Sequence, residues 1–279
     1  MCLAVFAIDA HPDWPLVLVA NRDEFHVRAT EPMQPWPDSP HILAGKDLQA
    51  GGTWLGIDTN ARLSLLTNVR DPANIKPDAP SRGRLAEQFL AGTMSGQDYL
   101  QRIAAESSQY NGFNLVIIDS ANMDNAGPNA WHASNYQQPF FGRIQPGVHG
   151  LSNALLNTSW PKTERTTASL RHYLSDAALI DSDALSQIML DNKPVPDALL
   201  PRTGLPLARE RLLGVPFIIS PSYGTRCTTI ILRHRGGLCW VQEDSFNPLG
   251  QRTGRVRWWN RPGLRWQETQ LDPGSLITT

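Results

Sequence analysis

The chain is 279 residues long and 41% hydrophobic, which is enough to bury a substantial core. Its formal net charge of -1, without a long run of Lys or Arg, excludes the electrostatic footprint of a nucleic-acid-binding protein and of a polybasic membrane patch. The longest apolar stretches fall far short of the roughly 18 residues that a membrane span needs, so we expect a globular protein without a membrane span.

The cysteines indicate a reducing compartment. Cys2, Cys227 and Cys239 form no C-x-x-C pair, and an odd number of cysteines cannot make a complete disulfide framework. The first residues lack the basic start and long apolar core of a secretory signal, because the first Lys or Arg is Arg22 and Asp9 interrupts the apolar run. We therefore expect a cytoplasmic protein whose first residues belong to the fold.

The first third of the chain alternates short apolar segments with turn residues. Segments 3–8 and 16–20 predict two strands joined as a hairpin, and segments 51–57 and 62–68 predict a second hairpin. Four prolines between residues 31 and 40 cannot join a central strand, so this segment is expected to be a surface loop.

Helical spacing of apolar residues begins near residue 81. Ser81 is a candidate N-cap for a helix that stops at Gly92, and Ser95 resembles the start of a capping box for a second helix. A strand is expected at 112–119. Two further helices are predicted, at about 159–174, with Pro161 in the first turn, and at about 183–190.

The last quarter returns to strand-like sequence. Segments 227–233 and 238–243 flank Gly236-Gly237, and a further strand is expected at 256–259. The chain has no internal repeat, no low-complexity segment and no sharp shift in composition. We therefore predict a single domain over residues 1–279, of the α+β class with mostly antiparallel sheet.

Residue 2 is the most informative position. Removal of Met1 would place a thiol and a free α-amino group together on Cys2. The α-amine has a reference pKa of about 7.7–8.0, close enough to the roughly 8.5 of a thiol to accept its proton, and amine-activated terminal nucleophiles are an established solution. The alternative is that Cys2 is a small buried hydrophobic residue beside the first strand.

Four polar residues, Asn21-Arg22-Asp23-Glu24, follow the second predicted strand. In an extended chain, Asn21 and Asp23 point to one face while Arg22 and Glu24 point to the other, so only one pair would face Cys2. A carboxylate near a terminal amine would orient it, and an arginine near the thiol would lower the thiol pKa. A turn would deliver both; the alternative is a solvated Arg–Asp pair.

Two asparagines and a late arginine are further candidates. Asn68 ends a predicted strand, and Asn153 lies in Gly150-Leu151-Ser152-Asn153. A neutral amide NH₂ is a suitable oxyanion donor, although asparagine is more often a turn residue. Arg226 precedes a predicted strand, where it is either a support for a nucleophile or substrate carboxylate, or an ordinary edge cation.

The remaining motifs give weaker indications of function. Ser152 lies one residue short of a G-x-S-x-G nucleophile elbow, so a serine hydrolase is an alternative. Seven histidines show no H-E-x-x-H and no Cys/His cluster, so we expect neither a metal site nor a cofactor. Gly51-Gly52 is not a phosphate loop and indicates a tight backbone approach, and some of the nine tryptophans are candidates to line an apolar pocket.

Taken together, several motifs that span most of the chain resemble the NRDE family, also called the transport and Golgi organization 2-like family. They are Met1-Cys2-Leu3, Asn21-Arg22-Asp23-Glu24-Phe25, Ala50-Gly51-Gly52-Thr53-Trp54-Leu55-Gly56, Thr67-Asn68-Val69-Arg70, Gly150-Leu151-Ser152-Asn153 and Gly224-Thr225-Arg226. That family in turn resembles the cysteine-type N-terminal nucleophile (Ntn) hydrolases, the group of the bile-salt hydrolases and penicillin V acylases. The resemblance implies an Ntn-hydrolase-like four-layer αββα sandwich.

The resemblance also implies roles for individual residues. It matches Cys2 to the nucleophile, Asp23 to the carboxylate near the amine, Asn68 and Asn153 to the oxyanion and amine-orienting positions, and Arg226 to the late arginine. In those hydrolases the early arginine precedes the aspartate by several residues, whereas Arg22 and Asp23 are adjacent. The resemblance therefore leaves open which of these two faces Cys2.

These observations favour an Ntn-type cysteine amidohydrolase or acyltransferase that acts on a small molecule. The alternative is a non-catalytic carrier or chaperone that holds haem or an acyl or lipid ligand in the same cleft. Animal members of the NRDE family are linked to Golgi organisation, lipid metabolism and haem handling, none of which requires hydrolysis.

Overall fold

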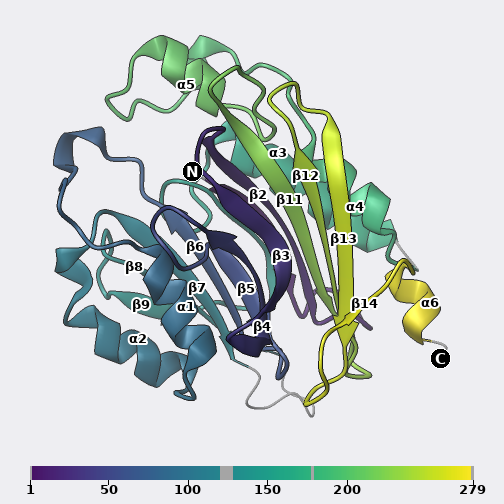
Figure 1. Ribbon diagram of the computed structural model, residues 1–279. Helices are drawn as coiled ribbons and strands as arrows, with labels where there is room; N and C mark the ends of the chain where they lie inside the picture. The colour runs from purple at the N-terminus through teal and green to yellow at the C-terminus, as the bar shows by residue number, and fades with distance from the viewer. Residues whose placement is uncertain (1, 120–127, 177–178, 278–279) are drawn as a thin grey trace.

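Two antiparallel sheets form the centre of the structure (Figure 1). The computed structural model describes residues 2–119, 128–176 and 179–277, and these residues form two seven-stranded sheets. In spatial order, sheet A comprises β10 (Gly147–Leu151), β1 (Cys2–Ile8), β2 (Leu16–Phe25), β11 (Tyr223–Arg233), β12 (Cys239–Phe246), β13 (Arg252–Asn260) and β14 (Gln267–Glu268). Sheet B comprises β3 (Thr30–Trp36), β4 (Ser39–Asp47), β5 (Leu55–Asp58), β6 (Leu63–Asn68), β7 (Phe113–Asp119), β8 (Asn129–Ser134) and β9 (Phe141–Arg143).

Helices cover the outer face of each sheet. The α-helices are α1 (Gly83–Ala91), α2 (Gly96–Ala104), α3 (Pro161–Asp176), α4 (Ser182–Met189), α5 (Leu207–Leu213) and α6 (Pro273–Ile277), and short 3₁₀ helices lie at Pro72–Asn74, Ser107–Gln109 and Asp197–Leu199. Buried residues of α3 and α4, such as Leu170 and Leu185, pack on sheet A, whereas α1 and α2 pack on sheet B through residues such as Phe89 and Leu100. The layers therefore run helix, sheet, sheet, helix, and the predicted four-layer αββα sandwich is confirmed.

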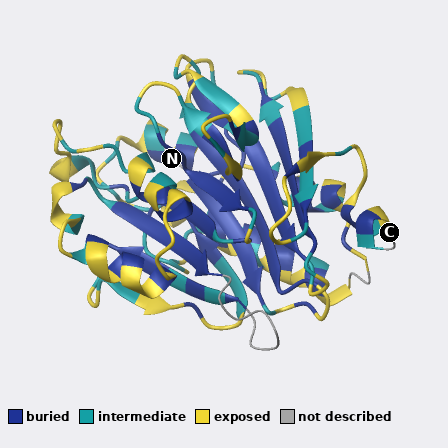
Figure 2. Cartoon of the chain, turned by 60° about the horizontal axis from the view of Figure 1, so that its bottom comes forward, coloured by how far each residue is buried: buried dark blue, intermediate teal, exposed yellow. Residues whose placement is uncertain are grey.

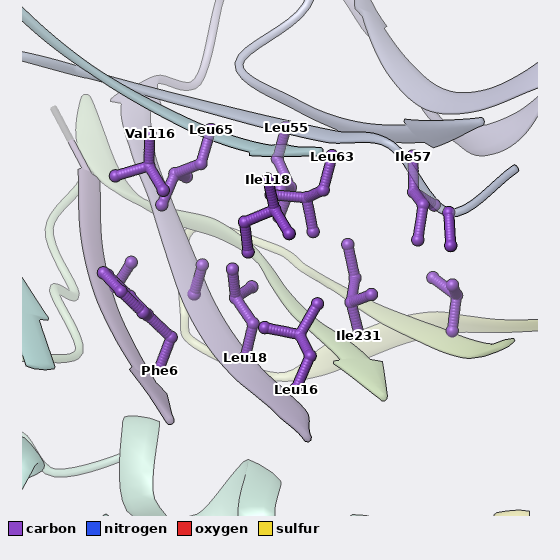
Figure 3. Packing of buried hydrophobic residues seen from close by; sticks show 14 of the residues in the cluster. Phe6, Leu16, Leu18, Leu55, Ile57, Leu63, Leu65, Val116, Ile118 and Ile231 are labelled. Atoms are coloured by element: carbon purple, nitrogen blue, oxygen red, sulfur yellow. The ribbon is translucent and has the colours of Figure 1, made fainter. Parts of the chain in front are cut away.

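The largest core lies between the two sheets. Phe6 and Leu18 of sheet A face Leu55, Leu65 and Val116 of sheet B, and all five are fully buried (Figure 3). Burial of side chains of this size contributes roughly 1.5–3 kcal/mol each, which makes this layer a main source of stability. Figure 2 shows the buried strands enclosed by helices whose outward faces are exposed.

Several local predictions are confirmed. The predicted hairpin and helix segments fold as β1 and β2, β5 and β6, and α1 to α4. Ser95 caps α2 as expected, because its Oγ accepts a hydrogen bond from the Asp98 backbone N–H at 3.1 Å. Gly92 ends α1, and Gly237 has a φ of 86° in the turn between β11 and β12.

Three local predictions are wrong. The segment with four prolines is not a loop but contributes β3 and the start of β4. Because β3 is an edge strand, Pro32 and Pro35 can be accommodated in it without the loss of hydrogen bonds between central strands. Strand β2 continues to Phe25, so the four polar residues from Asn21 lie within a strand rather than after it. Ser81 does not cap α1, which begins after Arg82. Within the described residues, no helix is long and apolar enough to cross a membrane.

Candidate active site

Cys2 is the first residue of β1, and its side chain faces the space between the sheets. Phe6 and Ile8, which lie on the same face of β1, belong to the core between the sheets. The strand register pairs Cys2 with Arg22 of β2, and Arg22 with Cys227 of β11. These three residues therefore form one row across sheet A, with Arg22 in the middle.

A polar cavity of about 150 Å³ lies beside Cys2. Besides Cys2, its lining includes Asn68, Trp54 and residues of the Gly51–Thr53 turn and of the start of α1. Its charged lining residues are Arg22, Asp23, Glu24, Arg28, Asp47 and Arg82. Opposite charges are therefore balanced in number around a single thiol.

Arg22 is 5% exposed and lies on the same face of sheet A as Cys2. Its guanidinium carbon is 4.4 Å from the centroid of the Trp54 ring, a cation–π contact that holds the side chain in place. Its Nη2 is 4.0 Å from Asp47 Oδ2, whereas its buried Nη1 has no hydrogen-bond partner among the described residues. Arg22 thus brings a positive charge to the thiol that the protein itself only partly compensates.

Asp23 points to the opposite face of β2 yet lines the same cavity. Its Oδ1 accepts a hydrogen bond from Thr225 Oγ1 at 2.7 Å, and Asp23 is 1% exposed. Among the described residues, β1 pairs with β2 only from Cys2 and Arg22 onward, so Asp23 lies at the open end of this pair. Both Arg22 and Asp23 can therefore border one cavity although their side chains diverge.

The environment keeps Cys2 protonated in the absence of a base. Burial raises the pKa of the Cys2 thiol, and the nearby Asp23 carboxylate raises it further, whereas Arg22 opposes the rise. Burial also raises the pKa of Asp23, and the charge of Lys162 opposes this change. A thiol in these surroundings needs a proton acceptor at the moment of attack.

Asn68 and Asn153 are brought together, but only one of them lines the cavity. Asn68, the last residue of β6, borders it directly. Asn153 is 1% exposed, follows β10 and donates a hydrogen bond from Nδ2 to the Asn68 backbone carbonyl at 2.9 Å. The geometry thus places Asn68 to contact a ligand and Asn153 to hold Asn68.

Arg226 lies outside the cavity lining, at a bulge between Thr225 and Cys227. Its Nη1 donates to the backbone carbonyls of Phe25, His26 and Arg28 at 3.0–3.2 Å. It therefore fixes the turn that follows β2, and this turn places Arg28 beside Asp47.

Ser152, the alternative nucleophile, is buried at the end of β10. Its Oγ lies 3.3 Å from the Cys2 backbone carbonyl and 3.3 Å from Asn153 Oδ1. Within the described ranges neither partner is a base, and Ser152 does not line the polar cavity. Its contacts join β10 to the start of β1.

A buried lysine that no sequence motif indicated also lies in this region. Lys162 is 2% exposed in the first turn of α3, where burial lowers its pKa to about 8 and Arg70 adds to the fall. Arg70 in turn makes an ion pair with Glu210 at 2.6 Å between Nη1 and Oε2. Pro161 signalled the start of the helix, but no local pattern indicates that the residue after it faces inward.

A second cavity of about 260 Å³ adjoins the first. The two cavities share Asn68 and Arg82 as lining residues. The second is mainly apolar, with Val69, Ile75 and Leu205 among its lining residues. Within the described residues, no cluster of His, Cys, Asp and Glu could hold a metal ion.

Comparisons with known proteins show which family the chain belongs to. The model of the family described as "Transport and Golgi organisation 2" matches residues 1–248. The "Transport and Golgi organization 2 homolog" of Mus musculus is 33% identical over 260 residues, covering 88% of this chain and 93% of that protein. The "Transport and Golgi organization protein 2 homolog" of Bos taurus gives the same identity and coverage.

Among solved structures, the chain is similar to the Caenorhabditis elegans N-acylethanolamine-hydrolyzing acid amidase ortholog, with a TM-score of 0.47 and 9% sequence identity. The alignment covers 83% of this chain and 92% of that chain. The family match extends over most of the sequence, from residue 1 to residue 248. The chain therefore belongs to the Transport and Golgi organisation 2 family.

Proposed function

We propose that this protein is an Ntn-type cysteine hydrolase or acyltransferase that acts on an amide or acyl bond of a small molecule. The observation that carries the proposal is the placement of Cys2 at the start of a central strand, in a cavity lined also by Arg22, Asp23 and Asn68. A cysteine with a purely structural role needs no such polar surroundings. Met1, whose removal the mechanism requires, lies outside the described residues.

In the proposed first step, the α-amine of Cys2 accepts the thiol proton, and the sulfur attacks the acyl carbon to form a C–S bond. Asp23 orients the resulting ammonium. Arg22, opposite Cys2, favours the thiolate electrostatically. The negative charge that develops on the acyl oxygen is stabilised by the side-chain amide of Asn68, a residue whose backbone carbonyl accepts a hydrogen bond from Asn153.

In the second step, the tetrahedral adduct collapses and the ammonium returns its proton to the leaving amine or alcohol. This leaves a thioester on Cys2. Water, or another nucleophile in a transferase, then gives its proton to the α-amine and attacks the thioester carbonyl. The carbon–sulfur bond breaks and the α-ammonium returns its proton to the sulfur, so that the whole cycle consumes one acyl substrate and one molecule of water or acceptor.

The experiment has two parts. Intact mass of the purified protein should show the loss of Met1, and a panel of acyl amides and thioesters should give turnover and a mass increase on Cys2. Cys2→Ala should abolish both, whereas Cys239→Ala, which removes a fully buried thiol from the core between the sheets, should retain activity. Retention of Met1 in the native protein would overturn the mechanism.

One observation favours a second candidate, a non-catalytic carrier. The apolar cavity beside Asn68 can hold an apolar ligand such as haem or an acyl or lipid chain without chemistry. Titration with haem and with acyl-CoA discriminates the two functions: a carrier binds stoichiometrically without product and tolerates Cys2→Ala, whereas an enzyme gives product that this variant does not.

The proposed setting is the cytoplasm. All three cysteines are buried free thiols, which fits a reducing compartment. The proposed partner is a small-molecule substrate or apolar ligand and not a nucleic acid. Fractionation of the native host cell, with the protein detected by antibody, tests this location.

A further inference from the structure

Two arginines of the polar cavity have guanidinium N–H groups that are not all paired with groups of the described residues. The buried Nη1 of the Arg22 guanidinium has no hydrogen-bond partner within the described ranges, and the closest carboxylate oxygen to this group, on Asp47, is 4.0 Å from Nη2. Arg82 is half-buried, and its Nη1 donates to the Gly112 carbonyl at 2.8 Å. Across the part of the chain that the structure describes, Arg82 makes no ion pair.

The carboxylates of the cavity are engaged elsewhere. Asp47 Oδ2 accepts from Arg28 through Nε at 2.8 Å and Nη2 at 2.7 Å. Asp23 accepts from Thr225, and Glu24 accepts from the Phe25 backbone N–H at 2.8 Å. Because buried guanidinium groups are stabilised by anionic partners, Arg22 and Arg82 together favour an anion from outside the protein.

The apolar cavity provides room for the rest of such a ligand. Ile75, a large apolar side chain that lines this cavity, is 64% exposed to solvent. Val69 and Leu205, which also line the cavity, are partly exposed. Arg82 and Asn68 border both cavities. A ligand whose reactive carbonyl lies near Asn68 can therefore extend into both cavities at once.

We propose that the substrate is an amphiphilic anion, whose oxyanion group binds between Arg22 and Arg82 and whose apolar body lies against Val69, Ile75 and Leu205. This inference rests on the proposed function, because it places the scissile bond beside Cys2. Arg82 is then the specificity-determining residue, since it is the charged group common to the two cavities. The oxyanion is a carboxylate or a phosphonate-like group, and the experiment separates these two.

The test measures binding without turnover. Cys2→Ala protein is titrated by calorimetry with N-decanoylglycine, N-decanoylaminomethylphosphonate and the neutral N-decanoylglycinamide. A charge-assisted hydrogen bond is worth enough to make an anion bind roughly tenfold or more tightly than the matched amide. Tighter binding of either anion supports the proposal and identifies the preferred head group, whereas equal binding of all three compounds, or binding of none, overturns it.

A second set of variants assigns the effect to Arg82. In the Cys2→Ala background, Arg82→Met should remove the preference for the anion, and Arg82→Lys should retain part of it. The matched control is Arg84→Met, in the first turn of α1, because Arg84 is an exposed arginine that lines neither cavity. Thermal unfolding of each variant checks that it is folded, and an unchanged preference in folded Arg82→Met overturns the assignment. Selective binding without any turnover by the wild type would instead retain the ligand class and refute the hydrolase.

Discussion

Cys2 and Arg22 stand directly opposite each other in the antiparallel pair of β1 and β2. Residues in register on neighbouring strands share a face, so the guanidinium favours the thiolate over the thiol. Arg22→Met should therefore raise the thiol pKa further and slow alkylation of Cys2 by iodoacetamide several-fold near pH 8. Intact mass over time gives the rate, and the exposed Arg171→Met is the control. Equal rates in wild type and Arg22→Met would contradict this coupling.

The two asparagines should separate in their effects. Asn68→Ala removes the amide that borders the cavity, so kcat should fall roughly 10²–10³-fold while the free energy of unfolding changes little. Asn153→Ala removes the donor to the Asn68 carbonyl and should also cost about 1–3 kcal/mol of stability. Urea unfolding and steady-state kinetics on both variants measure the split. A larger loss of stability in Asn68→Ala than in Asn153→Ala would refute the assigned roles.

Acid should destabilise the protein through His132. This residue of β8 is buried, its Nε2 lies 3.2 Å from Asn114 Oδ1, and burial lowers its pKa to about 4. In the unfolded chain the histidine pKa is near 6.5. Between about pH 6.5 and 4, His132 is therefore protonated in the unfolded chain but remains neutral in the folded protein. Stability should therefore fall as the pH drops through this window, by about 3 kcal/mol at most.

Urea unfolding at a series of pH values, for wild type and His132→Gln, isolates this contribution. The glutamine amide can still donate to Asn114 but does not titrate, so the slope between pH 6.5 and 4 should become shallower. His172→Gln is the matched control, because the His172 side chain is 82% exposed. Identical slopes for His132→Gln and wild type would show that other groups account for the acid sensitivity.

Two neighbouring glycines provide a test of the turn that borders the polar cavity. Gly51 and Gly52 have φ values of 70° and 73°, so alanine at either position costs about 1–2 kcal/mol of backbone strain. At Gly52 a Cβ atom would also come within 2.5 Å of the Gly83 carbonyl carbon, whereas at Gly51 it would meet nothing within 4 Å. Gly52→Ala should therefore lower the Tm much more than Gly51→Ala. Similar losses of Tm would mean that α1 can shift away.

Periodicity and caps made the helical layers predictable. The spacing of Leu85, Phe89, Leu170 and Leu185 places the helices on the sheets, and the tight approach expected at Gly51-Gly52 is observed where Gly52 contacts the start of α1. Strands β8, β9 and β10 were not predicted, because their polar and glycine-containing segments carry little strand signal.

The site was predictable only as a set of residues. Cys2, Arg22, Asp23 and Asn68 line one cavity, but alternation along β2 argued that Arg22 and Asp23 diverge. Both residues reach the cavity because Asp23 lies just beyond the point where the pairing of β1 with β2 ends. This point depends on the pairing register, which a single sequence does not reveal. Lys162 was missed for the same reason, since the inward orientation of its side chain depends on how α3 packs on sheet A.

Within the described residues, three of the four edge strands of the two sheets limit growth by strand addition. An open edge strand offers a row of amide hydrogens and carbonyls to any passing chain. Within the described residues, β14 is two residues long, β9 is three, and β3 interrupts its ladder with Pro32 and Pro35. These three edges offer few backbone amide hydrogens with which a strand of another chain could pair. The prolines of β3, which had suggested a loop, therefore reduce the tendency of this edge to aggregate.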